Sequence, residues 1–274
     1  YQPARQLGNL GGARQFGNLT AVKEYWGTFS GFEATPMRAR VMQYRPNEST
    51  WVIGKPAIDQ LFAGNEATLI AETRLYYDYN SGHTVAPSNG LLTKQETMSV
   101  LNGAYQSNPA SKANSFQYYA NGNLEWTRDE FNYQTTFYYD VWYQAHLVCQ
   151  VNPLGHRART TYYGVPGDGS CNTSNGSTAS VFNRFGLPEK QWDANGALTE
   201  HRYDDLGWMT AMAAAPDAIG APTVSHEFRS LSSIAVNQPF WLHQQQRDTS
   251  GGDNTLHTWT YYDGFGRVLQ TKAE

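Results

Sequence analysis

The strongest constraint on this chain is a Tyr-Asp motif that recurs along its length. Successive copies are separated by 42, 20, 24, 19, 21 and 59 residues, and most of these steps are near multiples of about 20. A regular period of this size indicates an array of equivalent small units rather than one irregular enzyme core. The clear copies are Tyr77-Asp78, Tyr139-Asp140, Tyr203-Asp204 and Tyr262-Asp263, and the looser ones are Tyr119-Ala120, Tyr163-Gly164 and Phe182-Asn183.

Each motif extends into a longer pattern of an aromatic residue, Asp or Asn, any residue, a large apolar residue and Gly. The glycines of this pattern are Gly186, Gly207 and Gly266, whereas Gly122 comes one residue early in its copy. A second group, such as Asp193-Ala-Asn-Gly, begins ten residues before the next aromatic residue. Gly122 and Gly186 each lie 17 residues before a motif tyrosine, so the copies keep a common register.

The repeating unit has the composition of a β-hairpin. Stretches such as 198–203 carry strand formers with a weak apolar–polar alternation. Asp-x-x-Gly favours a tight turn, because Asp or Asn caps its own backbone and Gly accepts a positive φ. A period of about 20 residues fits two strands and two turns. We therefore predict an all-β chain of repeated antiparallel hairpins in a continuous spiralling sheet, with little helix beyond a short segment at 57–62.

These residues resemble the YD-repeat, or Rhs-repeat, family, whose unit is similar to Tyr-Asp-x-x-Gly-Arg/Asn-Leu followed by Asp-x-x-Gly-x-x-Thr. The matching segments are 262–269, 193–199 and 122–124. The resemblance is good from residue 69 onward and weakest over 1–62. It implies that residues 1–274 form a single YD-repeat region, which we interpret as a fragment of a longer polypeptide.

The same resemblance implies a structural role. In this family the sheet spirals into a hollow shell, which encloses a toxin in bacterial toxin complexes and Rhs effectors. In teneurin-like cell-surface proteins a similar barrel serves adhesion. The partners implied are the rest of the same polypeptide or neighbouring subunits, together with an enclosed toxin or a cell-surface ligand. The location implied is secreted or at the surface of a bacterial cell.

The composition agrees with such a protein and argues against several other classes. Of the 274 residues, 14% are aromatic and only 16% are charged, which favours sheets with stacked rings. The net charge is −4 and no Lys/Arg cluster occurs, so a nucleic-acid partner has little support. Apolar runs are too short for a membrane-spanning helix. The histidines lack metal-ligand spacing and no phosphate-binding loop occurs, so we predict no metal and no cofactor.

We assign the motif aspartates, Asp78, Asp140, Asp204 and Asp263, to turns rather than to catalysis. A catalytic centre needs one convergent set of groups, whereas these carboxylates recur once per hairpin. No segment aligns with the autoproteolytic aspartyl site that the resemblance associates with Rhs shells. We therefore predict no enzyme activity. The expected structural residues are the stacking rings Tyr77, Tyr139, Tyr203 and Tyr262, and the turn glycines Gly122, Gly186, Gly207 and Gly266.

The two cysteines leave two alternatives open. Cys149 lies in a strand-like segment and Cys171 in a polar loop. A disulfide between them would close a loop of roughly 23 residues and add roughly 3 kcal/mol of stability. A secreted location would favour that pairing. The alternative is two unpaired thiols.

Three functions remain open. The first is a structural shell or scaffold, and the second is an adhesion module that binds a carbohydrate or a protein through exposed Tyr and Trp rings. Rings packed between strands would favour the first, and rings on an accessible face the second. The third, a β-propeller glycosidase, has the weakest support, because it requires paired acids in one cleft and blades of about 40 residues.

Overall fold

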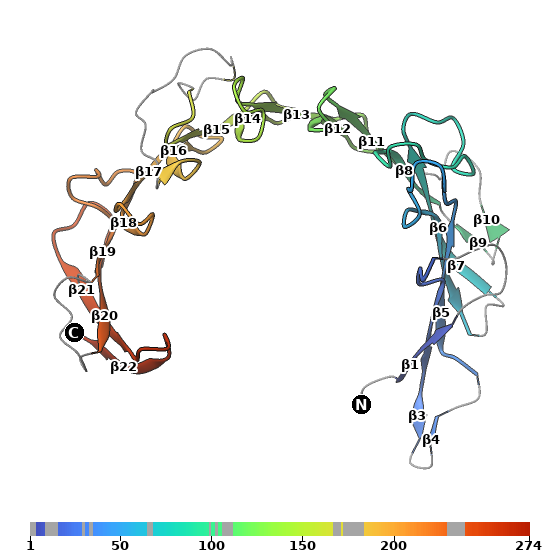
Figure 1. Cartoon of the computed structure of the whole chain (residues 1–274), viewed down its shortest axis with the longest axis horizontal. Helices are drawn as coiled ribbons and strands as arrows, with labels where there is room; N and C mark the ends of the chain where they lie inside the picture. The colour runs from blue at the N-terminus through green and yellow to red at the C-terminus, as the bar shows by residue number, and fades with distance from the viewer. Residues whose placement is uncertain are drawn as a thin grey trace. The chain divides into compact units, whose positions relative to one another are not determined.

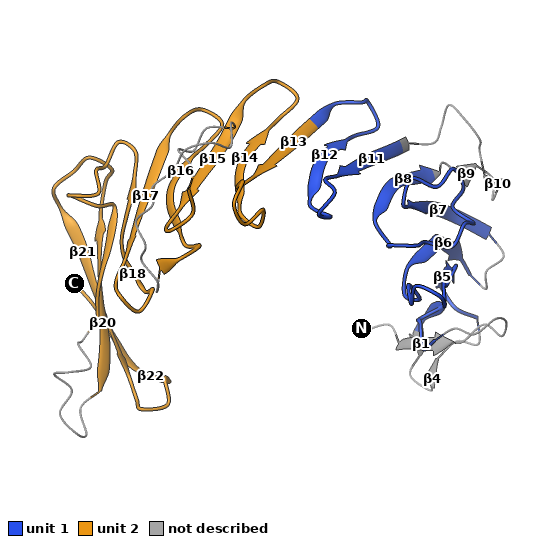
Figure 2. Ribbon diagram, turned by 45° about the horizontal axis from the view of Figure 1, so that its top comes forward, with its two compact units in different colours: residues 1–134 blue, residues 135–274 orange. Residues whose placement is uncertain are grey.

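The computed structural model consists of two compact units, residues 1–134 and 135–274 (Figure 2). The described residues form strands joined by turns and contain no α-helix, which confirms the predicted all-β class of antiparallel hairpins. That residues 1–274 form a single repeat region stays a prediction. The structure describes residues 4–8, 16–28, 31–32, 35–64, 68–98, 100–101, 104–105, 112–166, 171, 184–228 and 239–274.

The strands of unit 1 form a run of antiparallel neighbours (Figure 1). Two short pairs accompany this run, β3 (Gly27–Thr28) with β4 (Gly31–Phe32) and β9 (Val100–Leu101) with β10 (Ala104–Tyr105). In order of pairing, the strands of the run are β1 (Ala4–Gly8), β2 (Ala21–Tyr25), β5 (Arg38–Tyr44), β6 (Pro56–Ala63), β7 (Thr68–Tyr77), β8 (Leu92–Met98), β11 (Lys112–Tyr118) and β12 (Leu124–Arg128).

The strands of unit 2 pair antiparallel in strict chain order (Figure 1). Each strand therefore has its sequence neighbours as its hydrogen-bonding neighbours. They are β13 (Gln134–Tyr139), β14 (Leu147–Val151), β15 (Arg157–Tyr162), β16 (Pro188–Trp192), β17 (Leu198–Tyr203), β18 (Met209–Ala214), β19 (Val224–Phe228), β20 (Phe240–Arg247), β21 (Thr255–Tyr262) and β22 (Val268–Ala273).

Most strand residues are only half-buried, so cross-strand contacts carry much of the stabilisation. In β5 the alternation is clear, with Ala39 and Val41 buried and Arg38 and Arg40 exposed. In unit 2, His243 of β20 stacks on Trp259 of β21, the residue opposite it, at 4.2 Å between ring centroids and 5° between planes. Such ring pairs strengthen the sheet where a deep core is small.

The prediction of a short helix at 57–62 is wrong. These residues belong to β6, which pairs with β5 on one side and β7 on the other. The register with β7 shifts between Leu61 and Phe62, and this bulge breaks the strict alternation of a strand. Without alternation, the apolar spacing of the segment is closer to that of a helix. The two flanking strands override that local preference.

The hairpin β20–β21 presents two chemically different faces. The strands pair without a register shift from Phe240 opposite Tyr262 to Arg247 opposite Thr255. Because successive side chains point to opposite faces, Phe240 and Leu242 lie on one face and His243 on the other. One face of this hairpin is therefore largely apolar near the Tyr262 end.

Candidate functional site

The repeated feature of the structure is the turn that follows each motif tyrosine. In the turn Asp204–Trp208, the Asp204 N–H donates to the Trp208 carbonyl at 2.9 Å and the Gly207 N–H donates to the Asp204 carbonyl at 3.1 Å. The Asp204 Oδ1 atom accepts the N–H groups of Leu206 and Trp208, both at 2.9 Å. Gly207 has φ +84°, a conformation that a side chain would disfavour. One carboxylate oxygen therefore satisfies two backbone donors of the turn, and backbone carbonyls satisfy two more.

The same four hydrogen bonds recur in other turns of both units. They close the turn that begins at Asp263, at 2.9–3.0 Å, and the turn that begins at Asp193, at 2.8–3.0 Å. Gly266 and Gly196 take the fourth position with positive φ. Further copies of the turn begin at Asp129 and Asn152.

Asp78 closes a much longer loop in the same way. Its backbone N–H donates to the Leu91 carbonyl at 2.8 Å, and Gly90 has φ +80°. Its carboxylate accepts the backbone N–H groups of Ser88, Asn89, Gly90 and Leu91 at 2.7–3.1 Å. Burial would raise the pKa of Asp78, but these N–H groups outweigh it and lower the pKa. The carboxylate therefore pins both ends of a loop of more than ten residues.

The Asp140 carboxylate is the most enclosed of the motif carboxylates, and the residue as a whole is only 2% exposed. It accepts the backbone N–H groups of Tyr143, Ala145 and His146 at 2.6–3.0 Å, and the His146 Nδ1 atom lies 3.3 Å away. Burial would raise the pKa of Asp140, but the donors of His146, Tyr143 and Ala145 lower it below its ordinary value. Gln144, with φ +51°, stands where the short turns have Gly.

Each clear motif tyrosine is the last residue of its strand. Tyr77, Tyr139, Tyr203 and Tyr262 end β7, β13, β17 and β21. In every case the register with the next strand shifts just before the tyrosine, which then faces the first residue of that strand. The tyrosines thus occupy equivalent backbone positions at the same end of their hairpins.

Two looser copies of the motif were assigned one residue too late. The strands β11 and β15 end at Tyr118 and Tyr162, which have the same register shift as the clear copies. Tyr119 and Tyr163 stand in the position of Asp, since the Gly122 and Gly186 N–H groups donate to their carbonyls at 2.9 Å. Counted from Tyr118, Gly122 has the usual offset of the motif. Gly122 therefore comes one residue early only when the motif tyrosine is assigned to Tyr119 instead of Tyr118.

Gly186 closes the turn that Tyr163 begins. The Tyr163 N–H donates to the Leu187 carbonyl at 3.0 Å, so the segment between them is an insertion in one hairpin. The copy assigned at Phe182-Asn183 falls within this insertion, and those two residues lie outside the described ones. At Gly186 φ is +76°, and a Cβ would lie 2.9 Å from the His146 Nε2 atom. Both the backbone conformation and the close contact require glycine here.

The tyrosine hydroxyls link successive hairpins. The Tyr77 hydroxyl donates to the Pro56 carbonyl at 2.9 Å, and Pro56 faces Tyr44 of the preceding hairpin. The Tyr118 hydroxyl reaches the Leu92 carbonyl opposite Tyr77 in the same way, at 2.8 Å. We call the hydroxyls that reach back in this manner, Tyr44, Tyr77, Tyr118 and Tyr162, the hydroxyl ladder.

The hydroxyl ladder is partly buried. Burial raises the pKa of Tyr77 to about 12 and also raises the pKa values of Tyr118 and Tyr162. Sequence reasoning missed the ladder roles of Tyr44, Tyr118 and Tyr162. Counting four residues back from each turn glycine would have found Tyr118, because Tyr203 and Tyr262 have that offset.

Two of the motif rings also pack against the ring of a neighbouring strand. Tyr203 packs edge-on against Tyr163 at 5.8 Å between centroids, and Tyr262 packs against Phe240 at 5.9 Å. The Tyr163 hydroxyl donates to the His201 carbonyl at 3.0 Å. These contacts lie between neighbouring parts of the same sheet rather than around a common centre.

Cys149 and Cys171 lie at bonding distance, with Cα atoms 5.2 Å apart. That separation falls within the range of natural disulfides. Cys149 is 1% exposed in β14, whereas Cys171 belongs to the insertion between β15 and β16. The bond would therefore anchor this insertion to the sheet.

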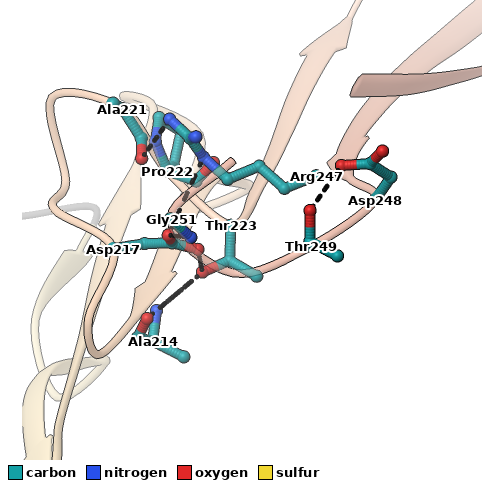
Figure 3. A network of polar contacts seen from close by, with 9 residues as sticks. All are labelled: Ala214, Asp217, Ala221, Pro222, Thr223, Arg247, Asp248, Thr249 and Gly251. Carbon is teal, nitrogen blue, oxygen red and sulfur yellow. Dashed lines mark hydrogen bonds and ion pairs between the residues drawn. The ribbon is translucent and has the colours of Figure 1, made fainter. Parts of the chain in front are cut away.

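A second polar cluster ties a loop to the tip of the hairpin β20–β21 (Figure 3). The Asp217 carboxylate accepts the Thr223 hydroxyl and the Gly251 N–H, both at 2.6 Å. These two donors, Thr223 first, lower the pKa of Asp217, and Arg247 adds to the effect. The Arg247 guanidinium itself donates to the carbonyls of Ala221 and Pro222 at 3.1 and 3.2 Å. The Asp217 carboxylate and the Arg247 guanidinium are thus engaged within the cluster and hold the loop in place.

Neither a cluster of metal-ligating side chains nor a membrane-spanning helix occurs in the part of the chain that the structure describes. In that part, no three His, Cys, Asp or Glu side chains converge as metal ligands. No helix of membrane-spanning length and apolarity occurs among those residues either.

Comparisons with known proteins identify the fold. The structure is similar to two solved structures, TcdB2-TccC3, with a TM-score of 0.57, and TcdB2-TccC3-TEV, with a TM-score of 0.54. Both are 12% identical in sequence over 93% of this chain, so the likeness concerns the fold. The chain spans only 16% and 18% of those two chains. No protein-family model and no curated protein matches the sequence.

Removing one hydroxyl of the ladder should weaken unit 1. We expect Tyr118→Phe to lower the free energy of unfolding by about 1 kcal/mol, because the Leu92 carbonyl loses its donor. Tyr133→Phe is the matched control, since Tyr133 is 61% exposed and its hydroxyl has no partner among the described residues. Denaturant titration of both variants measures the difference. Equal stability of the two variants would refute the role of the ladder.

The lowered pKa of Asp140 predicts a loss of stability in acid. A carboxyl with a lowered folded-state pKa stabilises the fold above its unfolded pKa of about 3.9, and this contribution disappears as the pH falls through the folded value. We expect Asp140→Asn to be less stable than the wild type at neutral pH, with a smaller further loss between about pH 5 and pH 2. Thermal unfolding across this range measures both, with Asp253→Asn, an exposed aspartate, as control.

The disulfide should stabilise the insertion. We expect Cys149→Ser/Cys171→Ser to lower the free energy of unfolding by about 3 kcal/mol, because the unfolded chain gains the freedom of the opened loop. Mass spectrometry after alkylation, with and without reductant, tests the bond itself. Alkylation of both cysteines in the unreduced, unfolded protein would show two free thiols.

Proposed function

We propose that the chain is a non-catalytic segment of a YD/Rhs-type β-shell that encloses a polypeptide cargo. The observation that carries this proposal is the hydroxyl ladder, because the hydroxyls of Tyr44, Tyr77, Tyr118 and Tyr162 each donate to a carbonyl of the preceding part of the sheet. Hairpins linked in this way build a wall rather than an isolated domain. The motif carboxylates are occupied by backbone N–H groups, which supports a structural role for them and no role in catalysis.

The fold likeness adds support. The chain resembles TcdB2-TccC3 over nearly its whole length but spans only 16% of that chain. A segment of that size fits a part of a larger assembly, with the rest of its own polypeptide or neighbouring subunits as partners. The proposed location is secreted or at a bacterial cell surface. The pairing of Cys149 with Cys171 supports it, because disulfides persist in oxidising compartments.

The test is protease protection of the cargo in the complete polypeptide that carries this chain. Mass spectrometry follows the release of cargo peptides from the native assembly and from an assembly opened by denaturant. We expect cargo peptides to appear only after opening, because a closed wall excludes the protease. The same cargo expressed alone serves as the control and should be cleaved rapidly. Equal cleavage rates in the native and opened assemblies would rule out enclosure.

An adhesion module is the second candidate, and one observation favours it. Several rings at hairpin turns are widely exposed, including Phe131 at 70%, Trp142 at 73% and Phe265 at 88%. Exposed rings of this kind suit recognition of a carbohydrate or protein surface. Cell binding that is lost on Trp142→Ala, without loss of folding, would favour this candidate over the shell.

A further inference from the structure

Unit 2 contains an apolar pocket that the repeat does not explain. It has a volume of about 810 Å³ and lies where β18, β19, β20 and β21 meet. Its wall is formed mainly by Trp208, Phe228, Phe240, Leu242 and Tyr262. Pockets of this size with mostly aromatic walls are typical of ligand sites.

The rings of the pocket pack against one another. Trp208 lies 4.8 Å from Phe228 and 5.8 Å from Phe240, and Phe240 lies 5.9 Å from Tyr262, between ring centroids. Phe228 and Phe240 are near-parallel at 19°. The aromatic wall of the pocket therefore holds its shape through contacts among its own rings, while Trp208 remains 40% exposed. A ligand meets a preformed surface rather than one that must be ordered on binding.

At the pocket, a residue without a hydroxyl occupies the position that a ladder tyrosine would take. Phe228 is the last residue of β19, but it faces Leu242 of β20 without a register shift and carries no hydroxyl. The carbonyl that a tyrosine there would reach is that of Met209, which faces Tyr203. His226 takes over this contact, with its Nδ1 atom 3.2 Å from the Met209 carbonyl oxygen. The His226 imidazole thus makes the contact that a tyrosine hydroxyl would make, and the position of that tyrosine is occupied by the apolar ring of Phe228.

The pocket wall carries no uncompensated charge. Its carboxylate, Asp263, accepts the N–H groups of Phe265 and Arg267 on one oxygen and the Arg267 guanidinium at 2.7 Å on the other. The Trp208 indole N–H and the Tyr262 hydroxyl have no hydrogen-bond partner among the described residues. The wall therefore suits a neutral, mainly apolar ligand that brings one or two hydrogen-bonding groups.

The rim of the pocket allows a main chain to approach. Gly264 and Gly266 line the pocket, and a Cβ built on either would meet no atom within 4 Å. A polypeptide offers carbonyl and N–H groups at this rim and an apolar side chain to the rings. A sugar would bring several hydroxyls to a wall with few polar partners, and unpaired hydroxyls cost binding energy.

We propose that this pocket binds an extended, uncharged polypeptide segment through a large apolar side chain. The rings of Trp208, Phe228 and Phe240 receive the side chain. The Trp208 indole N–H and the Tyr262 hydroxyl hydrogen-bond the ligand backbone. The site is independent of whether the assembly encloses a cargo.

Calorimetric titration of the intact protein with a defined peptide tests the site. The probe is acetyl-Gly-Thr-Phe-Thr-Leu-Gly-amide, and its control has Ser in place of Phe and Leu. We expect saturable binding of the first peptide and at least tenfold weaker binding of the second, because the apolar side chains supply the affinity. Equal binding of the two peptides, or no binding of the first at about 1 mM, would overturn the proposal.

Variants locate the binding in the pocket. We expect Trp208→Ala to weaken binding at least tenfold and Trp142→Ala, which removes a more exposed ring elsewhere in unit 2, to leave it unchanged. Tyr262→Phe keeps the ring and should weaken binding roughly fivefold, which preserves the test if Trp208→Ala fails to fold. Equal losses for the two tryptophan variants, or no loss with Tyr262→Phe, would refute the site. Tighter binding of maltotetraose than of the peptide would show a carbohydrate site instead.

Discussion

The fold depends on the closure of most hairpin turns by one polar side chain, usually an aspartate, at the first position of the turn. Asp204 shows the arrangement in its shortest form, with one carboxylate oxygen accepting two backbone N–H groups while the main chain closes on itself. In a sheet whose strand residues are mostly half-buried, unsatisfied turn donors would be costly and hydrophobic burial could not easily offset them. The carboxylate removes that cost locally, so each hairpin end is stable where it stands.

The tyrosine that precedes the carboxylate couples this local closure to the neighbouring hairpin. Its strand shifts register at that residue, and in the pair Tyr77-Asp78 the tyrosine hydroxyl also donates to the Pro56 carbonyl of the preceding hairpin. This Tyr-Asp pair thus combines two tasks, the joining of adjacent hairpins and the closing of one. At Tyr118 and Tyr162 the joining hydroxyl is present without an aspartate after it, whereas the strand that ends at Phe228 has neither group and lines the apolar pocket.

Sequence reasoning reached the strand class and the antiparallel hairpins, because these follow from turn chemistry and period. It placed Tyr119 and Tyr163 one residue off, since adjacent tyrosines cannot be distinguished without knowing which one ends the strand. It read 57–62 as helical because a bulge at Leu61 hides the alternation. The hydroxyl ladder and the aromatic pocket depend on residues far apart in the chain, such as Trp208 and Tyr262, and no local pattern indicates such contacts.

The insertion sizes have an evolutionary consequence. Asp204 closes a turn of five residues, whereas Asp78 uses the same contacts to close one that ends at Leu91. The closing bonds involve only the two ends of the connection, so its middle is free to lengthen at a small entropic cost. Mutation and selection can therefore diversify one connection, as between Asp140 and His146 with its exposed Trp142, while the neighbouring strands keep their ancestral register. Repeats of this kind can drift apart in sequence and still remain one architecture.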